Sequence, residues 1–156
     1  MTRQVDESCV LTEGPWTHRF VGANGSRFHV VEAGAGPLVL FLHGFPEFWW
    51  AWHDVLTQVA DAGFRAVAID LRGYGASDKP PRGYDGYTMA ADVTGVIRAL
   101  GERSAMIVGS GAGGMIGWAA AAQPIIPPAP APTIIAVRSP KARMRPVTSA
   151  AIVYPS

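Results

Sequence analysis

The sequence predicts an α/β protein with a mainly parallel sheet and helices on both faces of that sheet. Apolar runs at 37–44, 64–73 and 104–110 have the continuous hydrophobicity of strands that are buried on both sides. Between these runs, residues 47–63 and 89–102 carry apolar side chains at helical spacing. Strands that alternate with helices in this way are typical of a parallel sheet with helices packed on both faces.

The other elements are predicted from local signals. Asn24 and Gly25 lie between two β-prone runs and predict a hairpin over 16–34, because both residues tolerate the positive φ angles of a tight turn. Thr88 is expected to cap the second helix, since its hydroxyl oxygen can accept from a backbone N–H of the first turn. Residues 115–123 predict a third helix.

The composition changes sharply near residue 123. All twelve acidic residues lie at or before Glu102, whereas eight of the thirteen prolines lie at position 124 or later. We therefore divide the chain into 1–123 and a Pro/Ala-rich, degenerate segment at 124–156. In that second segment we expect a short strand at 133–137 and a mobile tail beyond it.

Composition and charge exclude several classes of function. With 156 residues, 49% hydrophobic and 16% charged, the chain predicts one domain with a hydrophobic core. A net charge of +1 gives no field that would attract nucleic acid. Neither a metal-binding Cys/His spacing nor a phosphate-binding Walker pattern occurs, so we expect no metal and no cofactor. The single cysteine, Cys9, and the lack of an apolar run at the start favour a cytoplasmic protein.

Residues 105–137 contain no charged side chain, which raises the alternative of a membrane span. Three glycines within four positions, at 111, 113 and 114, interrupt this stretch, and prolines follow from Pro124 onwards. No uninterrupted apolar helix of about 20 residues remains, so we expect no membrane span.

The glycine-rich sequence "GSGAGG" at 109–114 fits two different patterns. One is the G-x-G-x-x-G turn of dinucleotide-binding proteins, which follows the first strand and needs an acidic residue about 20 positions later. Here the turn follows the third parallel strand, and no acid occurs after Glu102. The other is the G-x-nucleophile-x-G elbow of hydrolases, which in this sequence is centred on Gly111. An elbow centred on Ser110 would need glycines at two positions that hold Val108 and Ala112.

Four segments carry a resemblance to a known family. "LFLHGFPEFWWAW", "AIDLRGYGASDKP", "GYDGYTMAADV" and "MIVGSGAGGMIGW" occur in the order and spacing of the N-terminal half of an α/β-hydrolase of the epoxide hydrolase group. The resemblance extends from about residue 14 to 123. It implies a partial α/β-hydrolase fold that lacks the cap and the C-terminal strands.

The resemblance also implies which residues form the site. His43, Gly44, Phe45 and Pro46 resemble the oxyanion turn of the family, in which the backbone N–H groups of Phe45 and Ala112 would face the reacting oxygen. We expect His43 to hold this turn in place rather than to act as a base, and Pro46 to be a candidate for a cis peptide bond.

Other residues have less specific roles. Trp49 is expected either to line the pocket or to belong to the core. Asp70, Arg72 and Asp78 resemble groups that order a loop by hydrogen bonds and ion pairs.

The nucleophile is the main departure from the family. In the family an aspartate at the elbow attacks an epoxide carbon and forms an ester, but this position holds Gly111. No acid or histidine follows Glu102 to serve as a charge-relay acid or a general base.

We therefore interpret the chain as a truncated, inactive epoxide-hydrolase-like protein. The alternative is a noncatalytic protein that uses the fold to bind a partner or a small apolar molecule. Self-association through an exposed sheet edge is a further expectation.

Overall fold

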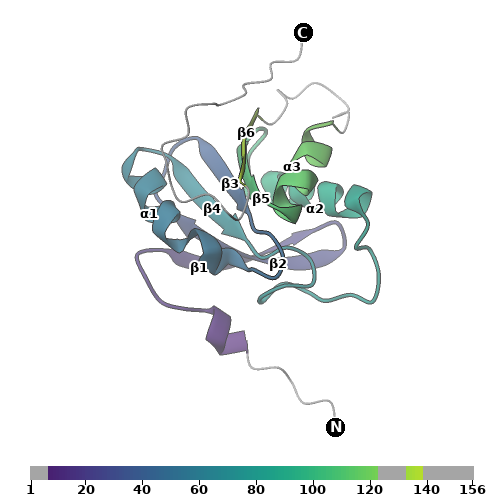
Figure 1. The fold of residues 1–156 in the computed structure, drawn as a ribbon. Helices are drawn as coiled ribbons and strands as arrows, with labels where there is room; N and C mark the ends of the chain where they lie inside the picture. Colours follow the sequence, from purple (N-terminus) through teal and green to yellow (C-terminus); the bar gives the residue numbers. More distant parts are fainter. Residues whose placement is uncertain (1–6, 123–132, 139–156) are drawn as a thin grey trace.

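The computed structural model describes residues 7–122 and 133–138, and these form a six-stranded sheet with the strand order β1-β2-β4-β3-β5-β6 (Figure 1). The strands are β1 (Thr17–Ala23), β2 (Ser26–Ala33), β3 (Leu38–Leu42), β4 (Arg65–Ile69), β5 (Met106–Ser110) and β6 (Thr133–Arg138). The helices are α1 (His53–Asp61), α2 (Gly86–Ala99) and α3 (Ala112–Ala122), with short 3-10 helices η1 (Glu7–Val10) and η2 (Trp49–Trp52).

The direction of the strands confirms the predicted sheet. Strands β4, β3, β5 and β6 pair with their neighbours in parallel, while the β1–β2 hairpin joins the sheet through an antiparallel contact between β2 and β4. The hairpin turns at Asn24 and Gly25, whose φ angles are 46° and 72°. Both angles are positive, as the Asn-Gly turn predicts.

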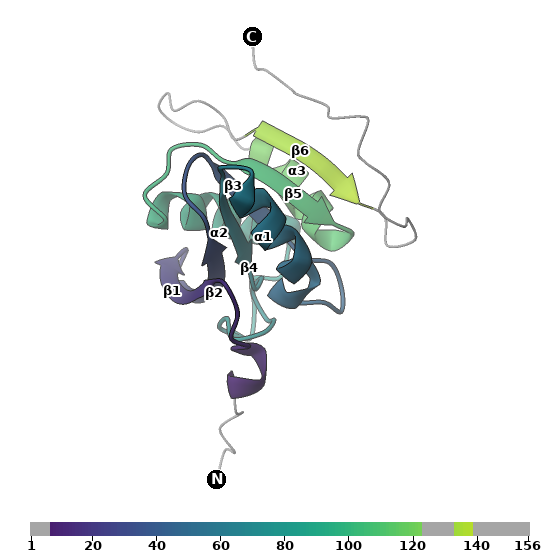
Figure 2. The ribbon, with the colours of Figure 1, turned by 90° about the vertical axis from the view of Figure 1, so that its left-hand side faces the viewer.

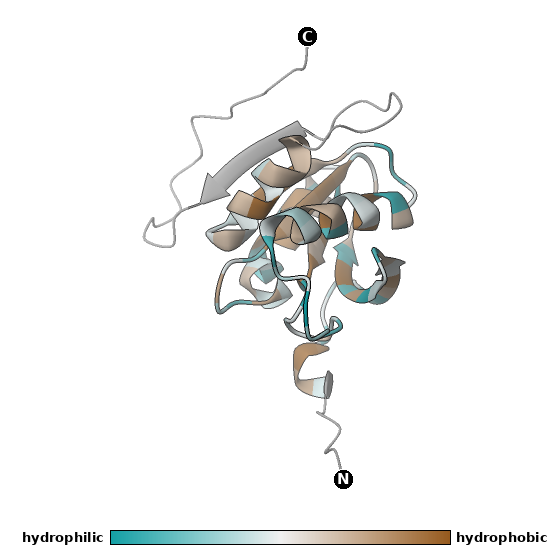
Figure 3. Cartoon of the chain, turned by 90° about the vertical axis from the view of Figure 1, so that its right-hand side faces the viewer, coloured by the Kyte–Doolittle hydropathy of each residue, from teal (hydrophilic) through white to brown (hydrophobic). Residues whose placement is uncertain are grey.

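The core lies in two layers, one on each face of the sheet. Along β3, Leu38, Leu40 and Leu42 pack in a cluster with side chains of α2 and α3, whereas Val39 and Phe41 pack in a second cluster with Leu56 of α1. This alternation is expected of a strand buried on both faces. Figure 2 shows α1 on one side of the sheet and α2 and α3 on the other. Figure 3 shows the hydrophobic strands behind α2 and α3.

Two strand predictions were too long at their carboxyl ends. The run predicted as 37–44 is a strand only at Leu38–Leu42, and the run predicted as 64–73 only at Arg65–Ile69. In the second case Asp70 ends the strand, because its carboxylate accepts hydrogen bonds from the backbone N–H groups of Trp49 and Ala76 and so begins a loop.

The helix predicted over 47–63 is α-helical only at His53–Asp61, after the 3-10 helix η2. The predicted starts of the other two helices were also wrong. The N-cap of α2 is Asp85 and not Thr88: the Asp85 carboxylate accepts from the backbone N–H of Thr88 at 2.9 Å and from its hydroxyl at 2.7 Å. Helix α3 begins at Ala112, three residues before the predicted start, because the paired glycines are packed into its first turn.

The second segment of the chain is described only in part. A strand is present at Thr133–Arg138, where 133–137 was predicted, and it pairs in parallel with β5. The remaining prediction for this segment, a mobile tail, lies outside the described residues. Among the residues that the structure describes, no helix is both long and apolar enough to cross a membrane.

Candidate functional site

Three turns lie side by side at the carboxyl ends of the parallel strands. Strands β3, β4 and β5 are parallel, so the segments that follow them all start at the edge formed by their carboxyl ends. These segments begin at His43, Asp70 and Gly111. In open α/β sheets this is the edge at which ligands bind.

The turn from β5 into α3 is sharp and is centred on Gly111. This residue has a φ of 51°, in the left-handed region, and its carbonyl accepts from the N–H groups of Gly114 at 3.1 Å and Met115 at 3.3 Å. The backbone thus passes from strand to helix within one residue, as in a nucleophile elbow.

The glycines on either side of Gly111 are required by close packing. A Cβ on Gly109 would lie 2.6 Å from the backbone of Gly114, and one on Gly113 would lie 2.3 Å from the carbonyl oxygen of Leu42. Position 111 is different, because the nearest atom to a Cβ there would be the Gly44 Cα at 3.8 Å. The spacing therefore supports an elbow centred on Gly111, where a side chain would have room.

His43 is completely buried beneath the neighbouring turn, and both of its ring nitrogens bond to backbone groups. Its Nδ1 lies 2.9 Å from the carbonyl oxygen of Gly44, and its Nε2 accepts from the N–H of Leu71 at 3.0 Å. One donated and one accepted bond match the neutral imidazole. Burial lowers the pKa of His43, against the hydrogen bond to Gly44 and the charges of Asp70 and Glu47, which raise it. These contacts support the predicted role of holding the turn.

The turn after β3 packs directly against the elbow. Gly44 lies so close to Ser110 that a Cβ would be 3.0 Å from the Ser110 carbonyl oxygen. Glu47 closes the turn, since its N–H donates to Gly44 O at 3.0 Å and its carboxylate accepts from Gly44 N–H at 3.2 Å. The peptide bond between Phe45 and Pro46 is cis, as the sequence suggested.

Trp49 lies in the core, which is one of its two predicted positions. Its side chain is fully buried in the cluster on the α1 face of the sheet. Its backbone N–H donates to Asp70 at 2.8 Å, and its indole N–H donates to the carbonyl of Val10 at 2.6 Å.

The loop after β4 is ordered by side chains, as predicted for Asp70, Arg72 and Asp78. Arg72 forms a two-point contact with Asp92 of α2, at 2.7 and 2.6 Å, and both residues are buried. Asp78 accepts from the backbone N–H of Arg27 at 2.8 Å. Asp92 was not identified from the sequence, and no local motif marks it.

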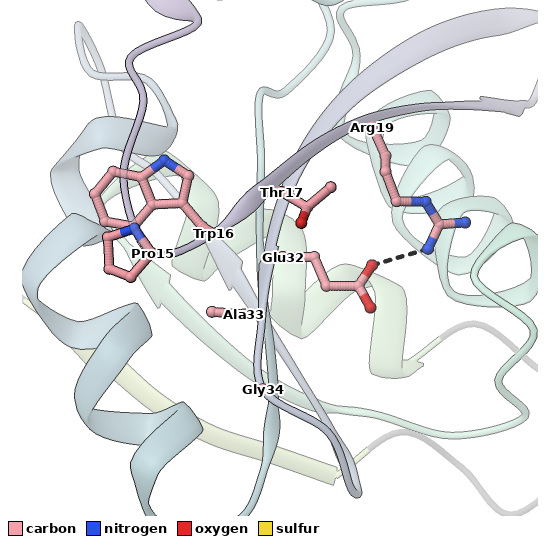
Figure 4. A pocket seen from close by; sticks show the side chains of 7 residues that line it. All are labelled: Pro15, Trp16, Thr17, Arg19, Glu32, Ala33 and Gly34. Atoms are coloured by element: carbon pink, nitrogen blue, oxygen red, sulfur yellow. Dashed lines mark hydrogen bonds and ion pairs between the residues drawn. The ribbon is translucent and has the colours of Figure 1, made fainter.

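A surface hollow of about 360 Å³ lies away from this edge. It is bordered by the ends of β1 and β2, and Figure 4 shows that two of its lining residues, Arg19 and Glu32, form an ion pair, with a distance of 2.9 Å. The lining residues are Pro15, Trp16, Thr17, Arg19, Glu32, Ala33 and Gly34. Because Ala33 pairs with Ala66 near the amino end of β4, the hollow is at the opposite edge from the elbow.

In the part of the chain that the structure describes, no cluster of three or more acidic, His or Cys side chains could hold a metal ion.

Comparison with known proteins agrees with this arrangement. The family described as "alpha/beta hydrolase fold" matches residues 37–149, and the chain belongs to that family. A Bacillus subtilis AB hydrolase superfamily protein, YfhM, is 43% identical over 105 residues, which are 64% of this chain and 36% of that protein. Epoxide hydrolase 1 of Siraitia grosvenorii is 42% identical over 65% of this chain and 33% of its own length.

Solved structures are similar in the same region. An epoxide hydrolase from an endophytic Streptomyces has a TM-score of 0.68 and 48% identity over 70% of this chain and 34% of its own. For the Vigna radiata epoxide hydrolase VrEH1 the TM-score is 0.67 and the identity 39%, over 69% of this chain and 35% of that one. The chain is thus a member of the α/β-hydrolase fold family that is similar to epoxide hydrolases, and it spans about a third of the length of these relatives.

Proposed function

We propose that this 156-residue chain keeps the backbone framework of an epoxide-hydrolase-type site but does not catalyse hydrolysis. The observation that carries the proposal is Gly111, a residue without a side chain at the centre of an otherwise well-formed elbow. A covalent mechanism needs a nucleophilic atom at this point.

The rest of the framework would act through backbone groups. In the reaction of the family, a carboxylate oxygen bonds to an epoxide carbon, the ring C–O bond breaks, and the ring oxygen takes up a proton. Water then hydrolyses the resulting ester. The N–H groups of Phe45 and Ala112 are the candidates for stabilising the oxyanion formed during that hydrolysis, and they need no particular side chain.

The direct test compares the natural chain with two variants at one position. Gly111→Asp introduces a carboxylate, and Gly111→Asn introduces a side chain of similar size that is a poor nucleophile. We expect no turnover of styrene oxide by the natural chain. Gly111→Asp should be alkylated once, seen by mass spectrometry as a single adduct at position 111, and Gly111→Asn should not. We expect no multiple turnover by these 156 residues even with Gly111→Asp, because no acid or histidine lies at 103–156 to activate water.

Repeated turnover by the natural chain would contradict the proposal. Ser110, which is next to the elbow centre and 9% exposed, would then be the first alternative nucleophile, to be tested by Ser110→Ala.

A second candidate function is noncatalytic binding of a small apolar molecule or a partner. Large apolar side chains near the elbow favour it: Phe45 is 77% exposed and Met115 75% exposed. The probe is a small aromatic amide, whose carbonyl oxygen can accept from the N–H groups of Phe45 and Ala112. Saturable shifts of these two amide signals in NMR would support binding, and unchanged signals at millimolar amide would exclude this ligand class.

Self-association through the sheet edge belongs to the same candidate function. Strand β6 is the last in the strand order of the described sheet, and an edge strand can pair with a second chain. Light scattering should detect oligomers, whereas a monodisperse monomer would contradict this part of the proposal.

A further inference from the structure

A line of hydrogen bonds connects the N-terminal part of the chain to the buried end of β4. The carbonyl oxygen of Thr12 lies 2.9 Å from Nε2 of His18, Nδ1 of His18 lies 2.9 Å from Nε2 of His29, and Nδ1 of His29 lies 2.7 Å from a carboxylate oxygen of Asp70. His29 and Asp70 are completely buried, and His18 is partly buried. The two imidazole rings are nearly parallel, at 7°.

The number of hydrogens in this line can be counted. Each of the three contacts needs one hydrogen between its two heavy atoms. A carbonyl oxygen has no hydrogen, and a neutral imidazole carries one N–H. Two neutral rings therefore supply two hydrogens for three contacts.

We assign the third hydrogen to the two rings and not to Asp70. Its Oδ1 accepts from the N–H of Trp49 at 2.8 Å, and its Oδ2 accepts from the N–H of Ala76 at 3.0 Å. Both oxygens act as acceptors, as in an ionised carboxylate. A buried carboxylate also needs a compensating positive charge nearby, and an imidazolium would supply one.

We propose that the His18–His29 pair binds one additional proton and that this proton fastens the N-terminal segment to the core. With three ring N–H groups all three contacts form at once. Without the extra proton one contact must be lost, and we expect it to be the outermost, between His18 and Thr12. The contacts that then hold residues 10–18 against the sheet include the bond from Trp49 to Val10 and the packing of Trp16 against Trp49.

Other charged groups around the pair have partners of their own. Arg27 lies over the ring of Phe20, which is next to His29, and its guanidinium pairs with Asp78 at 3.6 Å. On β1, the neighbouring Arg19 pairs with Glu32. The charge that contacts the pair directly is thus Asp70.

His43 provides an internal contrast, since the same count gives the opposite result. Only one of its two contacts needs a hydrogen from the ring, the one between Nδ1 and the Gly44 carbonyl. In the other contact the backbone N–H of Leu71 supplies the hydrogen, and Nε2 accepts it. One neutral imidazole satisfies both contacts. His43 is therefore the reference ring for a measurement on the same protein.

The test is nitrogen-15 NMR of the imidazole rings at pH 7.5, a pH at which histidines of an unfolded chain are mostly neutral. We expect three N–H hydrogens on His18 and His29 together, and one on His43. Two N–H hydrogens on the pair would overturn the proposal.

A second measurement follows the unfolding equilibrium from pH 7.5 upwards. Because the native state would hold one more proton than the unfolded state, stability should fall as pH rises, by up to tenfold in the equilibrium constant per pH unit. His18→Gln removes the proton-binding ring at the partly buried position. The slope of stability against pH should then decrease by the amount that corresponds to one bound proton. His53→Gln, at a histidine on α1, is the control and should leave the slope unchanged. An unchanged slope in His18→Gln would overturn the proposal.

Discussion

The turn after β5 and the loop after β4 lie at the same edge of the sheet, but they are held in place by different means. The turn around Gly111 is held by close backbone packing, in which Gly109 and Gly113 leave no room for a Cβ. The loop that begins at Asp70 is held by polar side chains, chiefly the buried pair of Arg72 and Asp92.

The difference shows how the shape of a site can be independent of its reactive side chain. Around Gly111 the backbone conformation does not depend on the side chain that performs the reaction, because the required residues are its glycine neighbours. In the loop after β4, removing Asp70 or the Asp92 partner of Arg72 would leave buried donors without acceptors. The elbow should therefore tolerate changes at its centre, whereas the loop should not tolerate changes at its anchors.

The largest effect is expected when the anchor of the loop is removed. Asp92→Ala leaves the Arg72 guanidinium, which is 5% exposed, without its carboxylate. The hydrogen bonds to Asp92 raise the pKa of Arg72. A guanidinium stays protonated in proteins even without a partner, so Arg72 remains charged when Asp92 is removed. Breaking a buried ion pair in this way costs about 3–5 kcal/mol.

Urea unfolding measures this cost, with Asp54→Ala as the control. Asp54 pairs with His53 at the surface, where its side chain is 77% exposed, and we expect a change within about 0.5 kcal/mol. A loss below about 1 kcal/mol for Asp92→Ala would show that the loop does not depend on this pair.

The next effect concerns the close packing of the elbow. Gly113→Ala would place a Cβ 2.3 Å and 2.4 Å from the carbonyl oxygens of Leu42 and His43. Since both atoms belong to a central strand and its turn, they cannot move independently, and we expect a loss of about 2–3 kcal/mol. Gly86→Ala is the control in a helix with open space around it, and it should be neutral or slightly stabilising. Thermal unfolding of the two variants distinguishes these outcomes.

A smaller effect is expected at the elbow centre. Gly111→Ala meets no atom closer than 3.8 Å, so its cost should come only from the positive φ of 51° and amount to about 1–2 kcal/mol. Gly101→Ala is the matched control, with a φ of 85° and nothing within 4 Å. If Gly111→Ala cost as much as Gly113→Ala in the same unfolding assay, position 111 would not be an open site.

The same comparison explains which parts could be predicted from the sequence. Turns and strands that depend on neighbouring residues were accessible: the Asn24-Gly25 hairpin, the parallel core strands and the elbow spacing around Gly111 are all local patterns. The polar anchors were only partly accessible. Arg72 was identified as a loop-ordering group, but its partner Asp92 is 20 residues away on a helix.

The His18–His29 pair could not be found in this way. His18 and His29 are diagonal neighbours in the hairpin, where His18 pairs with Val31 and His29 pairs with Phe20, and Asp70 is 41 residues from His29. No spacing rule connects these residues. Similarly, Thr88 was predicted as a helix cap because Ser and Thr often are, yet Asp85 three residues earlier has a carboxylate that accepts two hydrogen bonds from Thr88.

The smallest effect is expected at this cap, which is a polar anchor like Arg72 and Asp92 but lies at the surface. Hydrogen bonds from the backbone and hydroxyl of Thr88 lower the pKa of Asp85 below its ordinary value of 3.8. A group whose pKa is lowered by folding stabilises the folded state above its unfolded pKa, so the cap should act at neutral pH and be lost as the pH falls below about 3.8. Asp85→Ala should therefore speed amide exchange at Thr88 and Met89 at neutral pH, while Asp85→Asn, which can still accept a hydrogen bond, should have less effect. Equal exchange rates in all three proteins would show that the first turn of α2 is held by packing alone, and that only buried polar anchors matter in this fold.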